Sequence, residues 1–402
     1  MSLSKKDISF IQPSRNNLKY LKWSYDSIRK NAGEDPTICV ADDFSNDGTW
    51  EWCQEMMEKD SNFKAIRNEG PTRLGHTILY DRLINEVAPT KIVGIYHADM
   101  YLCPGALESV LEHIKPMTVV SLTRIEPDLH PAGPEKVLIE GAPTEPEDFN
   151  EEWFIEFFNN YLPQVKDKTT EGIFAPWFLF KEDFTSIGGH DPLYAPQSKE
   201  DSDIFNRFLL NGYKFVQTWE GAVFHLTCRG SRYNPTITEV GKESDEWLAQ
   251  NIRSTRNFIR KWGHFVKHDK FMMPVVPHKY DVEFKVTNSD DWARTINILE
   301  PWCSRMTVDC SEEIINDYIE LEQPNTQFDL TMRFNTSGES DIMSDIIVEF
   351  DARSLTQNSF NFIQQLSEIF DFNEFDSGEY EFDIFKIKVN RVKHYERNLI
   401  NL

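Results

Sequence analysis

Apolar and polar positions follow two different periods along the first part of the chain. Short runs rich in β-branched and aromatic residues are typical of buried strands, and stretches with apolar residues at i, i+3, i+4 and i+7 are typical of helices. Strands that alternate with helices at this pace indicate βαβ units and a mainly parallel sheet. The strands are expected at residues 8–12, 37–41, 63–67, 92–96 and 119–120, and the helices at residues 18–33, 50–57, 75–87 and 104–114.

The pattern is less regular between residues 126 and 270. Residues 126–149 contain five prolines among acidic residues, which predicts a loop rather than a packed element. A basic and aromatic helix is expected within residues 253–270, with its cations on a solvated face. The other elements expected here are helices at residues 154–161 and 200–211, strands at residues 173–180 and 223–226, and a turn at residues 187–191.

The pattern of apolar, polar and charged residues changes after Met273. The stretch Met-Met-Pro-Val-Val-Pro at residues 272–277 separates two parts, and the formal charge is −10 over residues 1–270 and −14 over residues 271–402. We therefore expect a first domain of residues 1–270 and an acidic α+β accessory domain of residues 271–402, whose role the sequence does not indicate. Its strands are expected at residues 281–286, 328–334, 345–350 and 380–389, and its helices near residues 291–302, 312–321 and 355–370.

Composition narrows the class of protein. The 402 residues are 40% hydrophobic and 27% charged, as in a globular protein large enough for two domains. A formal net charge of −24 disfavours nucleic acid and anionic membranes as partners, because both would repel the chain. The six cysteines form no CxxC pair and are expected to be reduced thiols of a cytoplasmic protein. No run approaches roughly 18 apolar residues, so no transmembrane segment is expected. The sequence does not indicate the oligomeric state.

The first candidate site lies where the strand at residues 92–96 ends. The run KIVGIYHADMYL at residues 91–102 changes from apolar to polar at His97 and Asp99. Ligands of open α/β sheets bind at the carboxyl ends of the strands. Because His97 and Asp99 are alternate residues, extended backbone projects them the same way, where they can share one cation. The alternative is a strand-end turn with two solvated polar residues.

Two other stretches place polar residues at element ends. Residues 40–49 read VADDFSNDGT, with the pair Asp42-Asp43 at the end of the second strand. Residues 199–215 read KEDSDIFNRFLLNGYKF, in which Glu200 and Asp201 begin a predicted helix. The short strand that follows carries His225.

Taken together and in this order, these motifs resemble glycosyltransferase family 2, the inverting enzymes with a GT-A fold. The family pattern has a strand, then DDxSxDGT, a D-x-D strand end, GG-x-D, an ED helix start and R-x-x-x-x-G-Y. The resemblance covers roughly residues 7–265 and implies a GT-A domain, an α/β fold with a mainly parallel sheet sandwiched by helices. The corresponding residues are Asp42-Asp43 through Thr49, His97-Ala98-Asp99, Gly188 to Asp191, Glu200-Asp201, and Arg207 to Tyr213.

The resemblance implies a divalent cation at the D-x-D position. Asp99 is the expected ligand of Mn²⁺ or Mg²⁺, because such hard cations prefer carboxylate oxygen. His97 departs from the family's aspartate, and its imidazole either ligates the cation or contacts the ribose or a phosphate. His225 lies where several relatives supply a histidine ligand. Its own sequence context favours a structural histidine on a strand, and only the resemblance favours a metal ligand.

The resemblance also implies a nucleotide-sugar donor, with a UDP-sugar favoured. Asp42 and Asp43 are expected to accept hydrogen bonds from the imide N–H of uracil and from a ribose hydroxyl, or else to cap the turn that follows. Pro13 at the end of the first strand and Arg73 complete the expected donor site, although Arg73 is equally a solvated surface residue. The loop Arg229-Gly230-Ser231-Arg232 is expected to close over the diphosphate.

Inversion requires one carboxylate to take the proton of the acceptor hydroxyl. Asp201 is the expected base and Glu200 the alternative, while the competing interpretation is that Asp201, Ser202 and Asp203 only cap the helix. The sequence therefore predicts a metal-dependent, inverting glycosyltransferase that acts on a hydroxyl acceptor, with the sugar and acceptor unspecified.

Two other classes of protein compete with this function. A sugar-phosphate nucleotidyltransferase requires a glycine-rich basic loop after the first strand, and Gln12-Pro13-Ser14-Arg15 contains no glycine. A non-catalytic carbohydrate- or partner-binding protein on a degenerate GT-A scaffold is favoured by one feature, His97 in place of aspartate.

Overall fold

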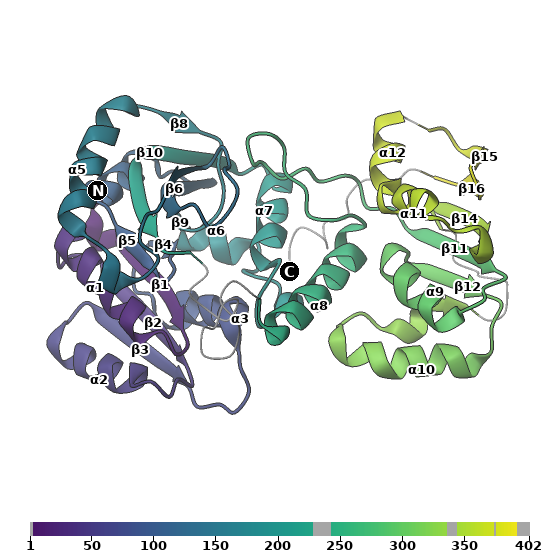
Figure 1. Ribbon diagram of the computed structural model, residues 1–402, viewed down its shortest axis with the longest axis horizontal. Coiled ribbons are helices and arrows are strands. Elements are labelled where there is room, and N and C mark those ends of the chain that lie inside the picture. Colours follow the sequence, from purple (N-terminus) through teal and green to yellow (C-terminus); the bar gives the residue numbers. More distant parts are fainter. Residues whose placement is uncertain (1–2, 228–242, 336–343, 374, 392–402) are drawn as a thin grey trace. The chain divides into compact units, whose positions relative to one another are not determined.

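The structure is a computed structural model that describes residues 3–227, 243–335, 344–373 and 375–391. The chain forms two compact units (Figure 1). Among the described residues, the N-terminal unit contains residues 3–250 and His268–Pro274, and the C-terminal unit contains Asn251–Lys267 and residues 275–391. No helix of the described residues is long and apolar enough to cross a membrane. The expectation that residues 1–270 fold by themselves stays a prediction.

One mixed sheet forms the centre of the N-terminal unit. Its strand order is β3-β2-β1-β4-β9-β6-β10-β5, with β7 beside β6 and β8 beside β10. The four strands β1 to β4 run parallel, and β9 is antiparallel to both β4 and β6. The strands are β1 Ile8–Ser14, β2 Thr37–Asp43, β3 Phe63–Asn68, β4 Ile92–Ile95, β5 Met100–Leu102, β6 Thr118–Pro127, β7 Lys136–Ile139, β8 Thr169–Thr170, β9 Trp177–Phe180 and β10 Lys214–His225.

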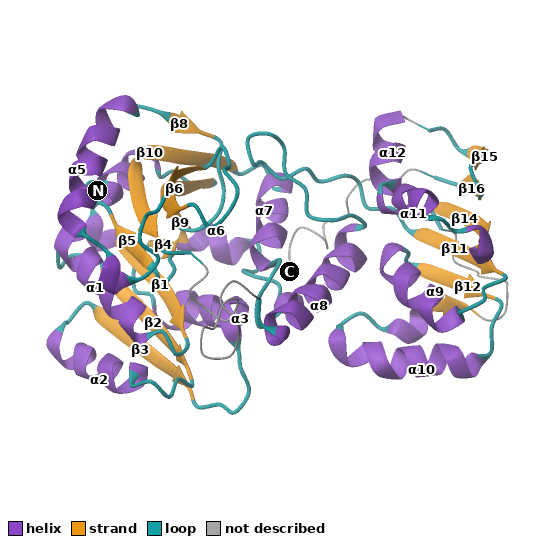
Figure 2. Cartoon of the chain, in the orientation of Figure 1, coloured by secondary structure: helices purple, strands orange, loops and turns teal. Residues whose placement is uncertain are grey.

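Helices cover both faces of this sheet (Figure 2). Side chains alternate between the faces of a strand, so Phe10 packs in one apolar cluster with α1, α2 and α4, while the adjacent Ile11 packs in another with α3, α6 and α7. The predicted α/β architecture, a mainly parallel sheet flanked by helices, is confirmed. The helices are α1 Leu18–Ala32, α2 Thr49–Lys59, α3 Gly75–Arg82, α4 Ala106–His113, α5 Glu151–Tyr161, α6 Lys181–Ser186 and α7 Glu200–Leu210. A further helix, α8 Asp245–Trp262, begins in this unit, but its residues from Asn251 onward belong to the C-terminal unit.

The prediction of a loop over residues 126–149 is wrong in part. The apolar run Lys136–Ile139 forms β7, which pairs in parallel with the end of β6 and extends the sheet. Prolines flank this run, and the prediction of a loop relied on these prolines rather than on the short apolar run between them. The strand predicted at residues 223–226 is the last part of the longer β10, which is interrupted by a register shift between Thr218 and Ala222.

The C-terminal unit contains a second sheet, of strand order β13-β12-β11-β14-β16-β15. The strands β11 to β14 pair in parallel, and β16 joins β14 and β15 by antiparallel pairing. Its strands are β11 Val282–Thr287, β12 Arg305–Val308, β13 Phe334–Asn335, β14 Ile346–Asp351, β15 Gly378–Phe382 and β16 Phe385–Val389, and its helices are α9 Trp292–Leu299, α10 Glu312–Glu322, α11 Gln357–Gln364 and α12 Leu366–Asn373.

Apolar side chains of this sheet pack with α9 to α12 in one core cluster, whereas alternate residues carry charge. Residues of opposite charge are register partners across four neighbouring strands, in the order Lys285, Glu349, Lys386 and Glu381. Opposite charges opposite each other stabilise a solvated sheet face. The second sheet domain at the C-terminus is therefore confirmed.

Two strands expected in the C-terminal part, and the basic helix expected within residues 253–270, differ in the structure. The strand expected at residues 328–334 is mostly a 3₁₀ turn, Leu330–Arg333, before the two-residue β13. The strand expected at residues 380–389 is a hairpin, which turns at Asp383 with φ of +51°. The solvated cationic face expected for the basic helix is wrong for Arg260, which is 2% exposed and bonds Glu300 at 2.6 Å.

Candidate functional site

Three of the residues singled out in the sequence converge at the carboxyl edge of the N-terminal sheet. His97 and Asp99 lie between β4 and β5, and His225 is the last residue of β10. One ligand atom from each lies within 4.8 Å of the others, and among the described residues this is the one cluster of histidine, cysteine and carboxylate groups of this kind. Nε2 of His225 is 3.4 Å from Oδ1 of Asp99. The arrangement can hold one cation, and its role as a metal site stays a prediction.

The electrostatics of the cluster favour an ionised Asp99. Burial alone would raise the pKa of Asp99, but the charge and hydrogen bond of His225 outweigh it and lower that pKa to about 2. Burial alone would lower the pKa of His225, but Asp99 and Glu126 raise it to about 9. Burial lowers the pKa of His97 to about 3 against the attraction of Asp99. His97 is therefore neutral near pH 7, with a ring lone pair that can bind a cation.

A fourth residue beside the cluster, His76 on α3, was not predicted. Its ring stacks on His97 with centroids 6.3 Å apart, and burial lowers the pKa of His76 to about 4. Tyr80 lies one helical turn further along and contacts the His76 ring. The signal in the sequence was the spacing of His76 and Tyr80, which places both on one face of the predicted helix.

Glu126 was also missed, because it lies at the start of the stretch that was predicted to be a loop. Its Oε1 is 2.8 Å from Nδ1 of His225, and its Oε2 is 3.1 Å from Nζ of Lys136. Burial alone would raise the pKa of Glu126, but the hydrogen bond from His225 and the charges of Arg124 and Lys136 hold it well below its usual range. Glu126 is thus an ionised, buried carboxylate behind His225.

Asp42 occupies the end of β2, as predicted, and makes the turn contact that was the alternative to nucleotide binding. Its Oδ1 accepts a hydrogen bond of 3.0 Å from the backbone N–H of Ser45. Its Oδ2 is 3.2 Å from Nε of Arg67, which lies at the register partner position on β3. Burial raises the pKa of Asp42 against these contacts. One carboxylate oxygen of Asp42 therefore lies beside the guanidinium of Arg67 at the carboxyl edge of the sheet.

Asp43 holds the start of α3. Its carboxylate accepts hydrogen bonds from the backbone N–H groups of Leu74 and Gly75 and from the amide of Asn68, at 3.2, 2.9 and 2.6 Å. Gly75 in turn lies against Pro196, just before α7, so closely that a Cβ would come within 2.1 Å of the Pro196 carbonyl oxygen. Asp43 therefore positions the helix that carries His76 and Tyr80.

The remaining residues of the predicted donor site are Pro13 and Arg73. Pro13 is a buried residue of β1 and the register partner of Ala41 on β2. Arg73 donates to Oε1 of Gln197 at 2.8 Å and to Oε1 of Glu246 at 3.0 Å, so its guanidinium contacts protein groups rather than solvent alone. The loop Arg229-Gly230-Ser231-Arg232 lies outside the described residues.

Glu200 and Asp201 form the first turn of α7, as predicted. Asp201 accepts a hydrogen bond of 2.6 Å from the backbone N–H of Ser202, within the first turn of the helix. Burial and the adjacent Asp201 raise the pKa of Glu200 to about 8. Burial and the negative charges of Glu200, Asp99 and Asp201 raise the pKa of Tyr80 far above its usual value.

The next charged pair on α7 is structural. Nε of Arg207 lies 2.8 Å from Oδ2 of Asp203, and both side chains are fully buried. Arg207 also donates to the carbonyl groups of Ile187 and Gly189. The arginine of the R-x-x-x-x-G-Y motif therefore fixes the Gly-Gly turn to α7.

Unpartnered polar atoms gather at the same edge of the sheet. Among the described residues, Oγ of Ser14, Oγ1 of Thr77 and Oε2 of Glu200 are buried without a hydrogen-bond partner. They belong to the end of β1 and the starts of α3 and α7. Buried polar groups are nearly always hydrogen-bonded in proteins, so such atoms fit a polar ligand.

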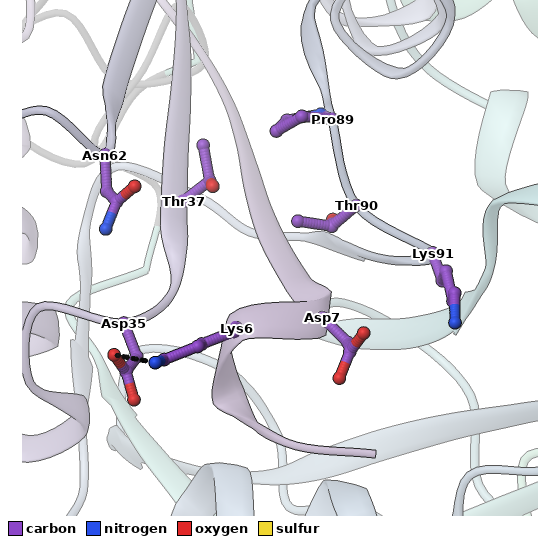
Figure 3. Close-up of a pocket in the computed structure, with 8 residues that line it drawn as sticks. All are labelled: Lys6, Asp7, Asp35, Thr37, Asn62, Pro89, Thr90 and Lys91. Atoms are coloured by element: carbon purple, nitrogen blue, oxygen red, sulfur yellow. Dashed lines mark ion pairs between the residues drawn. The ribbon is translucent and has the colours of Figure 1, made fainter. Parts of the chain in front are cut away.

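A cavity of about 500 Å³ lies at the opposite edge of the sheet (Figure 3). Thr37 and Asn62 mark the amino ends of β2 and β3, and Lys6 lies 3.8 Å from Asp35 across the opening. The predicted site residues do not line it. The lining residues are Lys6, Asp7, Asp35, Thr37, Asn62, Pro89, Thr90 and Lys91.

Residues 9–184 match the model of the glycosyl transferase family 2. The predicted resemblance is thereby confirmed for this part of the chain, whereas Glu200, Asp201 and His225 lie beyond the matched residues. Among curated protein sequences, no match was found.

Solved structures show more distant similarity. GalNAc-T7 with UDP, GalNAc and Mn²⁺ has 14% identity over 62% of this chain, with a TM-score of 0.44. The mannosyltransferase PcManGT of Pyrobaculum calidifontis, in complex with GDP-Man and Mn²⁺, has 16% identity over 62% of this chain and a TM-score of 0.40. TarS of S. aureus in complex with UDP-GlcNAc has 14% identity over 55% and a TM-score of 0.38. The chain covers 47%, 62% and 60% of these three proteins, less than two thirds of each.

Proposed function

From the match of residues 9–184 to glycosyl transferase family 2, we propose that this protein transfers a sugar from a nucleotide diphospho-sugar to a hydroxyl acceptor. The observation that carries the proposal is the convergence of His97, Asp99 and His225 at the carboxyl edge of the sheet. That edge is where open α/β sheets bind ligands. The same edge carries Asp42 and the start of α7, so donor and acceptor groups have polar partners on one side of the sheet.

The donor set fits a divalent cation. Two imidazoles and one carboxylate suit Mn²⁺, and three protein ligands leave positions for phosphate oxygens and water. A cation held there neutralises the charge that develops on the diphosphate leaving group. In this proposal His97 and Asp99 approach from the β4–β5 segment and His225 from β10, so the diphosphate is oriented by two separate strands.

A UDP-sugar is the proposed donor. Asp42 is fully buried, and its carboxylate is able to accept a hydrogen bond from the imide N–H of uracil. The unpartnered hydroxyl of Ser14 lies at the register partner position on β1 and offers a second polar contact. Asp43 has a different role in this proposal, because its contacts hold α3 rather than the nucleotide.

The reaction is proposed to invert the anomeric configuration. Asp201 takes the proton of the acceptor hydroxyl as that oxygen attacks opposite the departing diphosphate. Glu200 is the alternative base. Its raised pKa, about 8, leaves much of it protonated near neutral pH, which favours Asp201 for this role.

The second candidate is a carbohydrate-binding protein that has lost transfer activity. His97 favours it, because the family pattern has a carboxylate at this position. A binding protein would keep the donor site but would not need a base at the start of α7.

A donor-hydrolysis and transfer assay tests the proposal. Purified protein is given UDP-glucose, UDP-N-acetylglucosamine, UDP-galactose and GDP-mannose in separate reactions, with Mn²⁺ or with EDTA, and nucleotide release is measured. We expect release from a UDP-sugar with Mn²⁺ that EDTA and Asp99→Asn both abolish. Asp35→Asn is the matched control, because Asp35 lines the cavity at the opposite edge of the sheet. Binding of UDP without release of nucleotide from any donor would favour the binding protein instead.

A further inference from the structure

The two ring nitrogens of His225 face different carboxylates. Nδ1 is 2.8 Å from Oε1 of Glu126, whereas Nε2 points toward Asp99, 3.4 Å from its Oδ1. His97 lies on the same side as Asp99, with its ring centroid 5.6 Å from that of His225. His225 therefore bridges the candidate metal position and a buried carboxylate that takes no direct part in it.

We propose that Glu126 is a positioning residue for the candidate metal centre, which fixes the ring of His225 by accepting the hydrogen of Nδ1. With the Nδ1 hydrogen held by Glu126, the proton that a cation displaces is the one on Nε2, and the same hydrogen bond sets the ring plane. This proposal rests on the proposed function, because it needs a cation between His97, Asp99 and His225.

Glu126 is itself held rigidly. It is 1% exposed, and Lys136 and Arg124 lie 3.1 and 3.4 Å from its carboxylate oxygens. Arg124 also bonds Oε1 of Glu135 at 3.0 Å. The carboxylate of Glu126 therefore cannot turn away from His225 without breaking its contacts with Lys136 and Arg124.

The parallel pair of β6 and β7 supplies this support. Arg124 and Lys136 are register partners, as are Glu126 and Leu138. The proline-rich stretch after β6 thus returns to the sheet through β7 and places Lys136 beside Glu126. In this proposal the stretch completes the outer layer of the metal centre.

Glutamine at position 126 provides the sharpest test. One carboxylate oxygen of Glu126 faces Lys136, and the other faces both His225 and Arg124. Glu126→Gln removes the negative charge that favours a hydrogen on Nδ1 and leaves one oxygen for these three donors. A His225 ring that meets the amide N–H group has its hydrogen on Nε2, the atom that the cation needs. Glu135→Gln is the matched control, because it removes a buried carboxylate from the same charge network without touching His225.

The measurement is the affinity of the full chain for Mn²⁺, read from the electron paramagnetic resonance signal of free Mn²⁺, with and without UDP. Glu126→Gln should weaken Mn²⁺ binding by about 10–100-fold. Glu135→Gln should bind Mn²⁺ as the unaltered protein does. Adding Glu126→Gln to His225→Ala should cause no further loss, because Glu126 acts only through His225.

Other outcomes would overturn the proposal. Wild-type affinity in Glu126→Gln, or the same fold loss when His225 is already alanine, would show that Glu126 does not act through His225. If Glu126→Gln does not fold, Glu126→Asp retains the charge but draws the carboxylate back, and undiminished Mn²⁺ affinity in that variant would count against us. Absence of Mn²⁺ binding in the unaltered protein, even with UDP, would remove the metal centre of the proposed function. Normal binding there with normal binding in Glu126→Gln would remove only the positioning role.

Discussion

The backbone N–H of Gly75 donates a hydrogen bond of 2.9 Å to Oδ2 of Asp43, so the end of β2 is tied directly to the start of α3. Gly75 has φ of +71°, in the left-handed region, and its α-carbon faces the Pro196 carbonyl. Three segments that are far apart in the sequence meet at this glycine. The first prediction follows from how little space it has.

Gly75→Ala should lower the free energy of unfolding by roughly 2–5 kcal/mol, because the new Cβ meets rigid backbone and the residue keeps a left-handed conformation. The matched control is Gly105→Ala, where φ is +79° but no atom lies within 4 Å of the added Cβ. There only the conformational penalty applies, about 1–2 kcal/mol. Urea denaturation measures both. Equal losses in the two variants would show that the contact with Pro196 is not as tight as the structure indicates.

The second prediction concerns His97, where the family pattern has aspartate. Imidazole favours Mn²⁺ over Mg²⁺, whereas carboxylate oxygen serves both cations. We expect the unaltered protein to release nucleotide faster with Mn²⁺ than with Mg²⁺, and His97→Asp to narrow that difference. Rates measured with each cation at saturation give the ratio. A ratio that His97→Asp leaves unchanged would place His97 outside the ligand set.

Several site residues at the carboxyl edge of the sheet were predictable, because the patterns that identify them lie within short stretches of sequence. His97 and Asp99 follow a buried apolar run directly, and their chain order relative to Asp42 and Glu200 carries the family pattern. His225 could be added only through that pattern. Its neighbours in sequence do not distinguish a ligand from a structural histidine.

The missed residues depend on contacts across long sequence separations. Glu126 and His225 are 99 residues apart, and only the pairing of β6 with β10 brings them together. The sequence around Arg260 predicts a solvated cation. In the structure, Arg260 pairs in the core with Glu300, which lies 40 residues later in the chain. Asp42 and Asp43 are adjacent aspartates that the sequence does not distinguish. Only the packing of α3 against Asp43 gives the two residues different roles. Local pattern cannot carry this information, because it resides in tertiary contacts.

The third prediction uses the pH dependence of stability. Burial and Asp201 raise the pKa of Glu200 from 4.5 to about 8 in the folded chain. A raised carboxyl pKa means that the folded state binds the proton more tightly, so this contribution to stability is present below about pH 4.5 and is lost as pH rises toward about 8. The charged and titratable groups that interact with Glu200 include Lys199 just before α7, Asp201 on α7 and Tyr80 on α3.

Glu200→Gln should therefore become more stable relative to the unaltered protein as pH rises through this range. Urea denaturation across the range measures the difference, and Glu152→Gln on the exposed side of α5 is the control. Parallel pH profiles for Glu200→Gln and the unaltered protein would refute the prediction.

The fourth prediction concerns the domain boundary. Residues Asn251–Lys267 belong to the C-terminal unit, where Ile259 joins the core cluster and Arg260 bonds Glu300. A fragment of residues 1–274 should keep the N-terminal sheet folded, but the second half of α8 should lose protection from amide hydrogen exchange because its partners are gone. Mass spectrometry of exchange in the fragment and in the full chain tests this. A fragment with no protected sheet would contradict independent folding.

The last prediction concerns the base. If Asp201 takes the acceptor proton, Asp201→Asn should fold and bind UDP normally while kcat falls by roughly 10²–10⁴. Its hydrogen bond from the N–H of Ser202 does not distinguish this role from capping, because asparagine accepts the same bond. Turnover separates the two interpretations. With capping alone, Asp201→Asn should work at nearly the normal rate.

Glu200→Gln and Asp203→Asn complete the test of the base. Glu200→Gln should reduce kcat less than Asp201→Asn, and the reverse order would transfer the role to Glu200. Asp203→Asn breaks the fully buried pair with Arg207, so its loss should appear in the free energy of unfolding. If Asp201→Asn lowers both kcat and the free energy of unfolding, Asp201 has a structural role, as Asp203 does. A fall of kcat alone, with UDP affinity and stability unchanged, is the result that proton transfer by Asp201 predicts and that capping does not.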